Sequence, residues 1–150
     1  ILSDESIGFF IRDEFTGELI RVPTSACFLP LFAGLAGNEQ VLKMVSTLEN
    51  WMDQKFLLVP STAPHEPSYE PERYWRGPVW PHINWMICEG LSDYGFDDLS
   101  RKIRMQTLEL ISKLGFYEYY HPLGESGLGG SSFSWTAAVC LIWGNSTNTR

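Results

Sequence analysis

Residues 74–85, YWRGPVWPHINW, decide the fold, because a loop dense in proline and tryptophan passes there into a helix. Six of the nine prolines lie between Pro60 and Pro81, and a stretch so rich in proline cannot be one long helix. We therefore expect a long ordered loop that ends at Pro81, a residue type favoured in the first turn of a helix. Long loops in compact domains usually carry function.

On both sides of this loop the sequence predicts helices. Apolar residues recur at steps of three and four, most clearly after Asn38, which is a candidate cap. Gly95 and Gly115 are expected helix stops, and Ser132 is an expected cap of the last helix. The expected helices span residues 24–35, 39–54, 81–94, 97–114 and 133–143.

The remaining segments are expected to be an arm and a loop. Residues 1–22 alternate apolar and polar positions around a turn, which predicts an extended arm or hairpin. The glycines within residues 124–130 predict a flexible loop, so almost no strand is expected. Successive helix pairs resemble a toroid of helical hairpins, and a proline-rich loop with several tryptophans is rare in a four-helix bundle. The prediction is an all-α fold, a fragment of an all-helical barrel.

Composition narrows the possible partners. The 150 residues suit one domain, and a net charge of −7 argues against nucleic acid and anionic lipid. The apolar core of the longest uncharged stretch, residues 133–143, is shorter than the ~20 residues that span a bilayer.

The chain opens on Ile1 without a signal peptide pattern, so we expect a truncated chain. The three cysteines form no C-x-x-C pair, which favours reduced thiols and a cytoplasmic location.

Aromatic residues are the unusual feature of the composition. Phe, Tyr and Trp together number 21, six of them Trp, and many gather within residues 69–85. A second group, residues 116–120 (FYEYY), surrounds a single acid, Glu118. Aromatic rings often simply fill a core. The functional alternative is a cleft whose walls stack on the flat C–H faces of sugars.

Three short motifs occur in order and point to a family. They are YWRGPVW at residues 74–80, FYEYYHP at residues 116–122, and FSWTAA at residues 133–138. Together they resemble the C-terminal part of glycoside hydrolase family 63, which is related to trehalases and glucoamylases. Within that family the chain is most similar to the hydrolases of mannosylglycerate and glucosylglycerate. The resemblance extends over essentially the whole chain.

The resemblance implies a fold and a reaction. The fold is the C-terminal part of an (α/α)6 toroid, with residues 1–150 as a single, partial catalytic domain. The reaction is inverting hydrolysis of a small α-linked glycoside, in which an acid and a base stand about 6.5–9.5 Å apart. By motif position Glu118 is the general base, whereas the family's proton donor is an aspartate upstream of the matched segment. We therefore expect the chain to be inactive alone and to need the N-terminal part of the same barrel as its partner.

The same resemblance assigns the sugar subsite. Arg76 would orient substrate oxygens or brace the loop, and Glu125 would bind substrate hydroxyls or serve as the second choice of base. Trp135 would pack at the barrel mouth, with a core position as the alternative. The histidines show no metal spacing, so no metal and no cofactor are expected. The residues expected to bind substrate are Tyr74, Trp75, Arg76, Trp80, Glu125 and Trp135.

Two other functions remain open at the level of sequence. A processing α-glucosidase that acts on glucosylated oligosaccharides would share the frame and the chemistry. A non-catalytic helical carbohydrate-binding module would keep the aromatic surface without the reaction.

Overall fold

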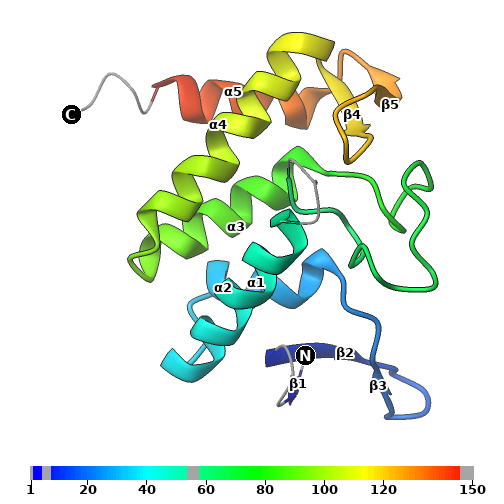
Figure 1. Ribbon diagram of the computed structural model, residues 1–150, viewed down its shortest axis with the longest axis vertical. Helices are drawn as coiled ribbons and strands as arrows, with labels where there is room; N and C mark the ends of the chain where they lie inside the picture. The colour runs from blue at the N-terminus through cyan, green and yellow to red at the C-terminus, as the bar shows by residue number, and fades with distance from the viewer. Residues whose placement is uncertain (1, 5–7, 54–57, 146–150) are drawn as a thin grey trace.

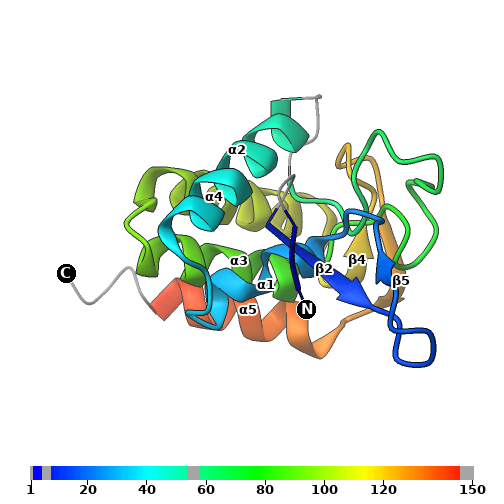
Figure 2. The same cartoon turned by 90° about the horizontal axis from the view of Figure 1, so that it is seen from below.

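The computed structural model describes residues 2–4, 8–53 and 58–145 of the chain. Helix α3 lies at the centre of the helical part and packs against α1, α4 and α5 (Figure 1; Figure 2). A 3-10 turn, η1, leads directly into α1, so the predicted helix over residues 24–35 forms in two short pieces. The helical elements are η1 (Ser25–Phe28), α1 (Leu29–Phe32), α2 (Asn38–Asp53), α3 (Pro81–Asp93), α4 (Asp97–Leu114) and α5 (Ser134–Asn145).

Three of the predicted helix boundaries are confirmed. Pro81 is the first residue of α3, and Gly95 follows that helix with φ +82°. Gly115 ends α4 with φ +93°. A positive φ is strained for residues with a Cβ atom, which explains why glycine stands at the C-terminal ends of both α3 and α4.

Two predicted caps are wrong. The carbonyl of Gly37 accepts the first helical hydrogen bond of α2, from Val41 N at 2.9 Å, so the cap falls on Gly37 and not on Asn38. The carbonyl of Phe133 does the same for α5, and Ser132 stands one residue earlier with φ +58°. Gln54, the expected last residue of the second helix, lies outside the described residues.

The expectation of almost no strand is also wrong, because two small antiparallel sheets accompany the helices. The predicted N-terminal arm forms a three-stranded sheet of β1 (Leu2–Asp4), β2 (Gly8–Arg12) and β3 (Leu19–Ile20). The second sheet pairs β4 (Tyr117–Tyr120) with β5 (Gly127–Ser131). Strand β5 occupies the stretch predicted to be a flexible loop. A Cβ atom on Gly127 would lie 2.1 Å from the ring of Tyr117, so glycine lets that ring lie against the paired strand.

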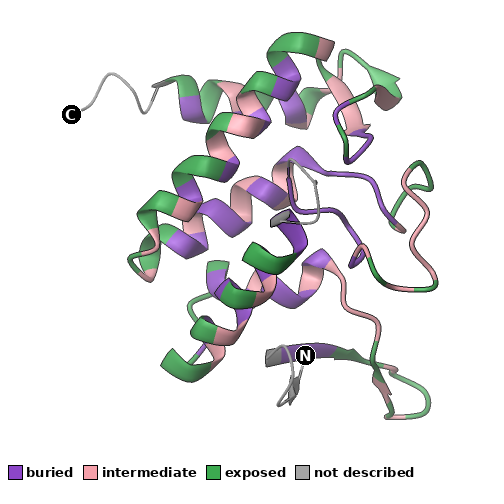
Figure 3. Ribbon diagram, in the orientation of Figure 1, coloured by how far each residue is buried: buried purple, intermediate pink, exposed green. Residues whose placement is uncertain are grey.

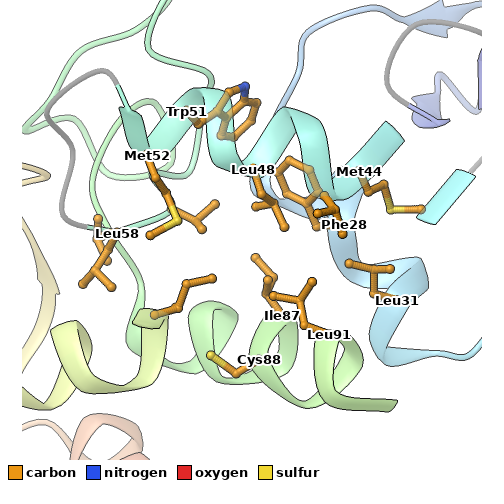
Figure 4. Close-up of a cluster of buried hydrophobic side chains, with 14 of the residues drawn as sticks. Phe28, Leu31, Met44, Leu48, Trp51, Met52, Leu58, Ile87, Cys88 and Leu91 are labelled. Atoms are coloured by element: carbon orange, nitrogen blue, oxygen red, sulfur yellow. The ribbon is translucent and has the colours of Figure 1, made fainter. Parts of the chain in front are cut away.

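A single apolar core joins α2 to α3 and α1. Leu48 and Met52 of α2 point toward α3, whose Ile87 and Leu91 belong to the same buried cluster (Figure 4). The ring of Trp51 meets Phe28 edge to face at 5.0 Å, and both side chains are fully buried. Burial of each large apolar side chain contributes roughly 1.5–3 kcal/mol, so this cluster is a major source of stability for the helices around α3.

The predicted long loop before α3 is ordered, and its two ends are buried beside the helix while its tip is exposed (Figure 3). Ser61 N donates to Pro78 O at 2.9 Å, which joins the two ends. Val79 N donates to Tyr120 O at 2.8 Å, which joins the loop to β4. The loop and the β4–β5 hairpin are thereby held side by side. Among the described helices, none is long and apolar enough to cross a membrane.

Candidate active site

The tip of the loop is built around Glu70. Its backbone N donates to Arg76 O at 2.7 Å, and its carboxylate lies 3.1 Å from Arg76 Nη1 and 3.1 Å from Arg73 Nη1. Arg76 Nε also donates to Ser68 O at 3.0 Å. A Cβ atom on Gly77 would lie 2.3 Å from the carbonyl of Glu70, so only glycine allows the loop to close this tightly. Arg76 is expected either to orient substrate oxygens or to brace the loop, and its observed contacts brace the loop.

Three rings from the loop and β4 form a stack. The indoles of Trp75 and Trp80 are parallel within 4°, with centroids 3.8 Å apart. The ring of Tyr119 stacks on Trp80 at 4.7 Å, and Tyr74 meets Trp80 edge to face at 5.0 Å. Trp80 is buried and donates from Nε1 to Tyr74 O at 3.1 Å, whereas Trp75 is 43% and Tyr74 50% exposed. The loop therefore presents two of these rings, Tyr74 and Trp75, at the surface.

Trp135, at the start of α5, extends this surface. Its ring lies 6.0 Å from Trp80 and 4.7 Å from His82, and it is neither fully buried nor fully exposed. We call the five rings of Tyr74, Trp75, Trp80, Tyr119 and Trp135 the aromatic wall. It draws on the loop, on β4 and on α5, three segments that are far apart in sequence.

Glu118 lies beside the aromatic wall on β4. Its Oε1 is 3.5 Å from the hydroxyl of Tyr74, and its Oε2 accepts from Gly130 N at 3.3 Å. Its backbone carbonyl accepts from Trp135 Nε1 at 3.1 Å. The side chain is half-buried, so the carboxylate is positioned by named partners and is still accessible to water.

The other predicted acid lies elsewhere. The carboxylate of Glu125 is 66% exposed and stands 3.7 Å from Nδ1 of His121. Among the described residues, no hydrogen bond or ion pair joins Glu125 to the aromatic wall. The structure thus brings five predicted residues together, Tyr74, Trp75, Trp80, Glu118 and Trp135, and leaves Arg76 and Glu125 outside the group.

Sequence reasoning missed His82 as part of this site. The imidazole packs on Trp135 and lies edge-on to Trp75 at 6.2 Å and to Trp80 at 5.7 Å. Burial lowers the pKa of His82, and its buried Nδ1 has no hydrogen-bond partner among the residues that the structure describes. No spacing rule marks such a residue, since its role depends on rings from other segments. Within the described ranges, no cluster of three His, Cys, Asp or Glu side chains could hold a metal ion.

Comparison with protein families finds a match over most of the chain. Residues 2–136 match the family described as "Mannosylglycerate hydrolase MGH1-like glycoside hydrolase domain". The chain is 45% identical to the mannosylglycerate hydrolase MGH1 of Selaginella moellendorffii, over 95% of this chain and 29% of that protein. It is 46% identical to the mannosylglycerate hydrolase of Thermus thermophilus, over 95% of this chain and 34% of that protein. It is also 35% identical to the glucosylglycerate hydrolase of Mycolicibacterium hassiacum, over 80% of this chain and 28% of that protein.

Solved structures agree with these matches. The crystal structure of the GH63 mannosylglycerate hydrolase from Thermus thermophilus in complex with glucose superposes with a TM-score of 0.92. The match has 45% identity and covers 95% of this chain and 36% of that one. Neutral trehalase Nth1 from Saccharomyces cerevisiae, at 23% identity and a TM-score of 0.72, shares the fold. The chain spans about a third of the length of these relatives, and both the family resemblance and the helical-toroid fold class are confirmed.

Proposed function

Because this chain belongs to the mannosylglycerate hydrolase MGH1-like family of glycoside hydrolases, we propose that it contributes to an inverting hydrolase of mannosylglycerate or glucosylglycerate. Residues 1–150 form a part of one catalytic domain in this proposal. The chain's own contribution is the general base and one wall of the sugar subsite.

The observation that carries the proposal is the position of Glu118. Its carboxylate is held at both oxygens, by the Tyr74 hydroxyl and the Gly130 amide, beside stacked indoles. A general base must be oriented toward the water that it activates, and it must be reachable by that water. A half-buried carboxylate with fixed partners meets both requirements.

The exposed rings suit a small sugar. Tyr74 and Trp75 offer apolar faces at the surface, while the buried Trp80 supports them from behind. A pyranose ring presents flat C–H faces that pack on such rings and hydroxyls that need polar partners. Glu118 and the Tyr74 hydroxyl are polar groups at the edge of this surface, so an apolar wall with a polar edge supports a sugar ligand.

Inversion also needs a proton donor on the opposite side of the glycosidic bond. The family resemblance assigns that role to an aspartate upstream of the matched segment. We therefore propose that the donor is supplied from outside these 150 residues, by the remainder of the same barrel. Glu118 alone would not support turnover, because one carboxylate cannot act as acid and base on opposite faces at once.

The reaction can be followed directly by proton NMR. The full-length polypeptide that carries this sequence is incubated with mannosylglycerate and, separately, with glucosylglycerate, and the anomeric signal is read before mutarotation. We expect the β-anomer to appear first from at least one α-linked substrate. Early α-anomer would contradict inversion, and hydrolysis of neither glycoside would contradict the proposed substrate class. A glucosylated oligosaccharide serves as control and should not be cleaved.

A further inference from the structure

The β4–β5 hairpin contains an irregularity at the residue proposed as the base. Tyr117 pairs with Ser131, whereas Tyr119 pairs with Leu128. Two residues of β5, Gly129 and Gly130, therefore stand opposite the single residue Glu118. This is a β-bulge, a feature that turns a side chain away from the direction a regular ladder would give it.

The bulge directs backbone groups at Glu118. Gly129 has φ +71°, a left-handed conformation that glycine adopts without strain, and the next amide approaches the Glu118 side chain. That amide, Gly130 N, donates to Glu118 Oε2 at 3.3 Å. The Glu118 carbonyl in turn accepts from the Trp135 indole at 3.1 Å. The Gly130 amide thus holds the Glu118 carboxylate, and the Glu118 carbonyl holds Trp135, one ring of the aromatic wall.

Gly129 also leaves no space for any other residue type. A Cβ atom there would lie 2.6 Å from Glu118 Oε2, 2.8 Å from Glu118 Cβ and 2.7 Å from Tyr119 Cε1. Rotation of the carboxylate alone would not relieve the contact with Glu118 Cβ, which is fixed to the strand. A side chain at this position requires a shift of Glu118, of Tyr119 or of the strand that carries Gly129, and each of these shifts changes the place of Glu118 relative to the bulge.

We infer that the bulge at Gly129 and Gly130 is the device that positions Glu118, with Gly129 as a positioning residue for the reaction. This inference rests on the proposed function of Glu118. On the other side of the carboxylate, Tyr74 reaches Oε1 from a backbone with φ +32°, which is also rare for a residue with a side chain. Two unusual backbone conformations from separate segments therefore converge on the same carboxylate.

The first test is Gly129→Ala in the full-length polypeptide, with Gly95→Ala as the matched control. Gly95 has φ +82°, so alanine meets similar backbone strain, but a Cβ atom there meets nothing within 4 Å. We expect kcat to fall roughly a hundredfold in Gly129→Ala, the order of loss for a catalytic group misplaced by about 1 Å, with KM within about twofold. The control should keep wild-type kcat. Equal kcat in the two variants would overturn the inference.

A second variant keeps the test decisive if Gly129→Ala does not fold. Deletion of Gly130 restores one-to-one pairing between β4 and β5 and removes the bulge. We expect a melting temperature close to that of the wild type and a loss of kcat of the same order. Wild-type kcat in the deletion variant would overturn the inference. Loss of folding in both variants would also overturn it, because the bulge would then serve the fold.

Glu118→Gln separates this inference from the function on which it rests. Full activity in Glu118→Gln would refute the proposed base. An inactive Glu118→Gln together with a fully active Gly129→Ala would leave the base in place and refute only the role of the bulge.

Discussion

Two regions of this molecule are rich in aromatic rings, and they use those rings in opposite ways. Between α2 and α3, Trp51 and Phe28 are fully buried. In the aromatic wall, Trp75 and Tyr74 stay about half exposed although their rings contact Trp80. The core gains stability from burial, whereas the wall leaves apolar area in water and includes a rare backbone conformation at Tyr74. This exposed apolar area supports the proposed sugar subsite.

The first prediction concerns the core. Trp51→Ala removes a fully buried indole from the α2–α3 cluster, and we expect the free energy of unfolding to fall by about 3–5 kcal/mol. Urea denaturation of the full-length polypeptide, followed by circular dichroism, measures the loss. A fall below about 1 kcal/mol would mean that the cluster does not stabilise the fold as described.

The second prediction concerns the wall. Trp75→Ala removes a 43% exposed ring, so the stability loss should be limited to the stacking on Trp80, about 0.5–1.5 kcal/mol. KM should rise on the order of tenfold, which corresponds to about 1.4 kcal/mol. Trp75→Phe is the matched control and should recover part of the affinity. An unchanged KM in Trp75→Ala would remove this ring from the proposed sugar subsite.

A smaller loss of stability is expected when either of the two arginines that pair with Glu70 is replaced. Arg76→Ala loses both the ion pair and the bond to Ser68 O, and should cost about 1 kcal/mol in unfolding free energy. Arg73→Ala loses only a more exposed pair with the same carboxylate and should cost less than about 0.5 kcal/mol. Thermal melts compare the two variants. Equal costs would show that Arg76 does not brace the loop more than Arg73 does.

The smallest expected effect is a pH dependence of the unfolding free energy that arises from His82. Burial holds the pKa of His82 below its ordinary 6.5, so the unfolded chain binds a proton where the folded chain does not. The unfolding free energy should therefore fall as the pH is lowered through 6.5 toward the folded pKa. His82→Asn should flatten this part of the stability profile, whereas His65→Gln, at an exposed position, should leave it unchanged. If the unfolding free energy falls with pH at the same slope in both variants, the pH dependence arises from other groups.

The helices could be predicted from the sequence because their signals are local. Apolar spacing marks α2 and α4, and Pro81, Gly95 and Gly115 mark helix ends through their backbone preferences. The two misplaced caps differ by one residue, since a cap is set by the hydrogen bonds that the preceding loop allows.

The site could be predicted only in part, because much of it depends on contacts between distant segments. The motifs identify Glu118 and the tryptophans, which the structure brings together. Strand β5 could not be predicted, because a run of glycines in sequence indicates a loop. Only the structure shows that these glycines make room for the tyrosine rings of β4. His82 has no local signal either, since only the fold brings it to Trp135.

We propose that Glu118, and not Glu125, is the general base. The most direct measurement is kcat for Glu118→Gln and Glu125→Gln in the full-length polypeptide, with folding checked by circular dichroism. Loss of a general base costs about 10²–10⁴-fold, and we predict a loss of that size for Glu118→Gln and a change of less than about fivefold for Glu125→Gln. A near wild-type kcat in Glu118→Gln, or the larger loss in Glu125→Gln, would contradict the claim.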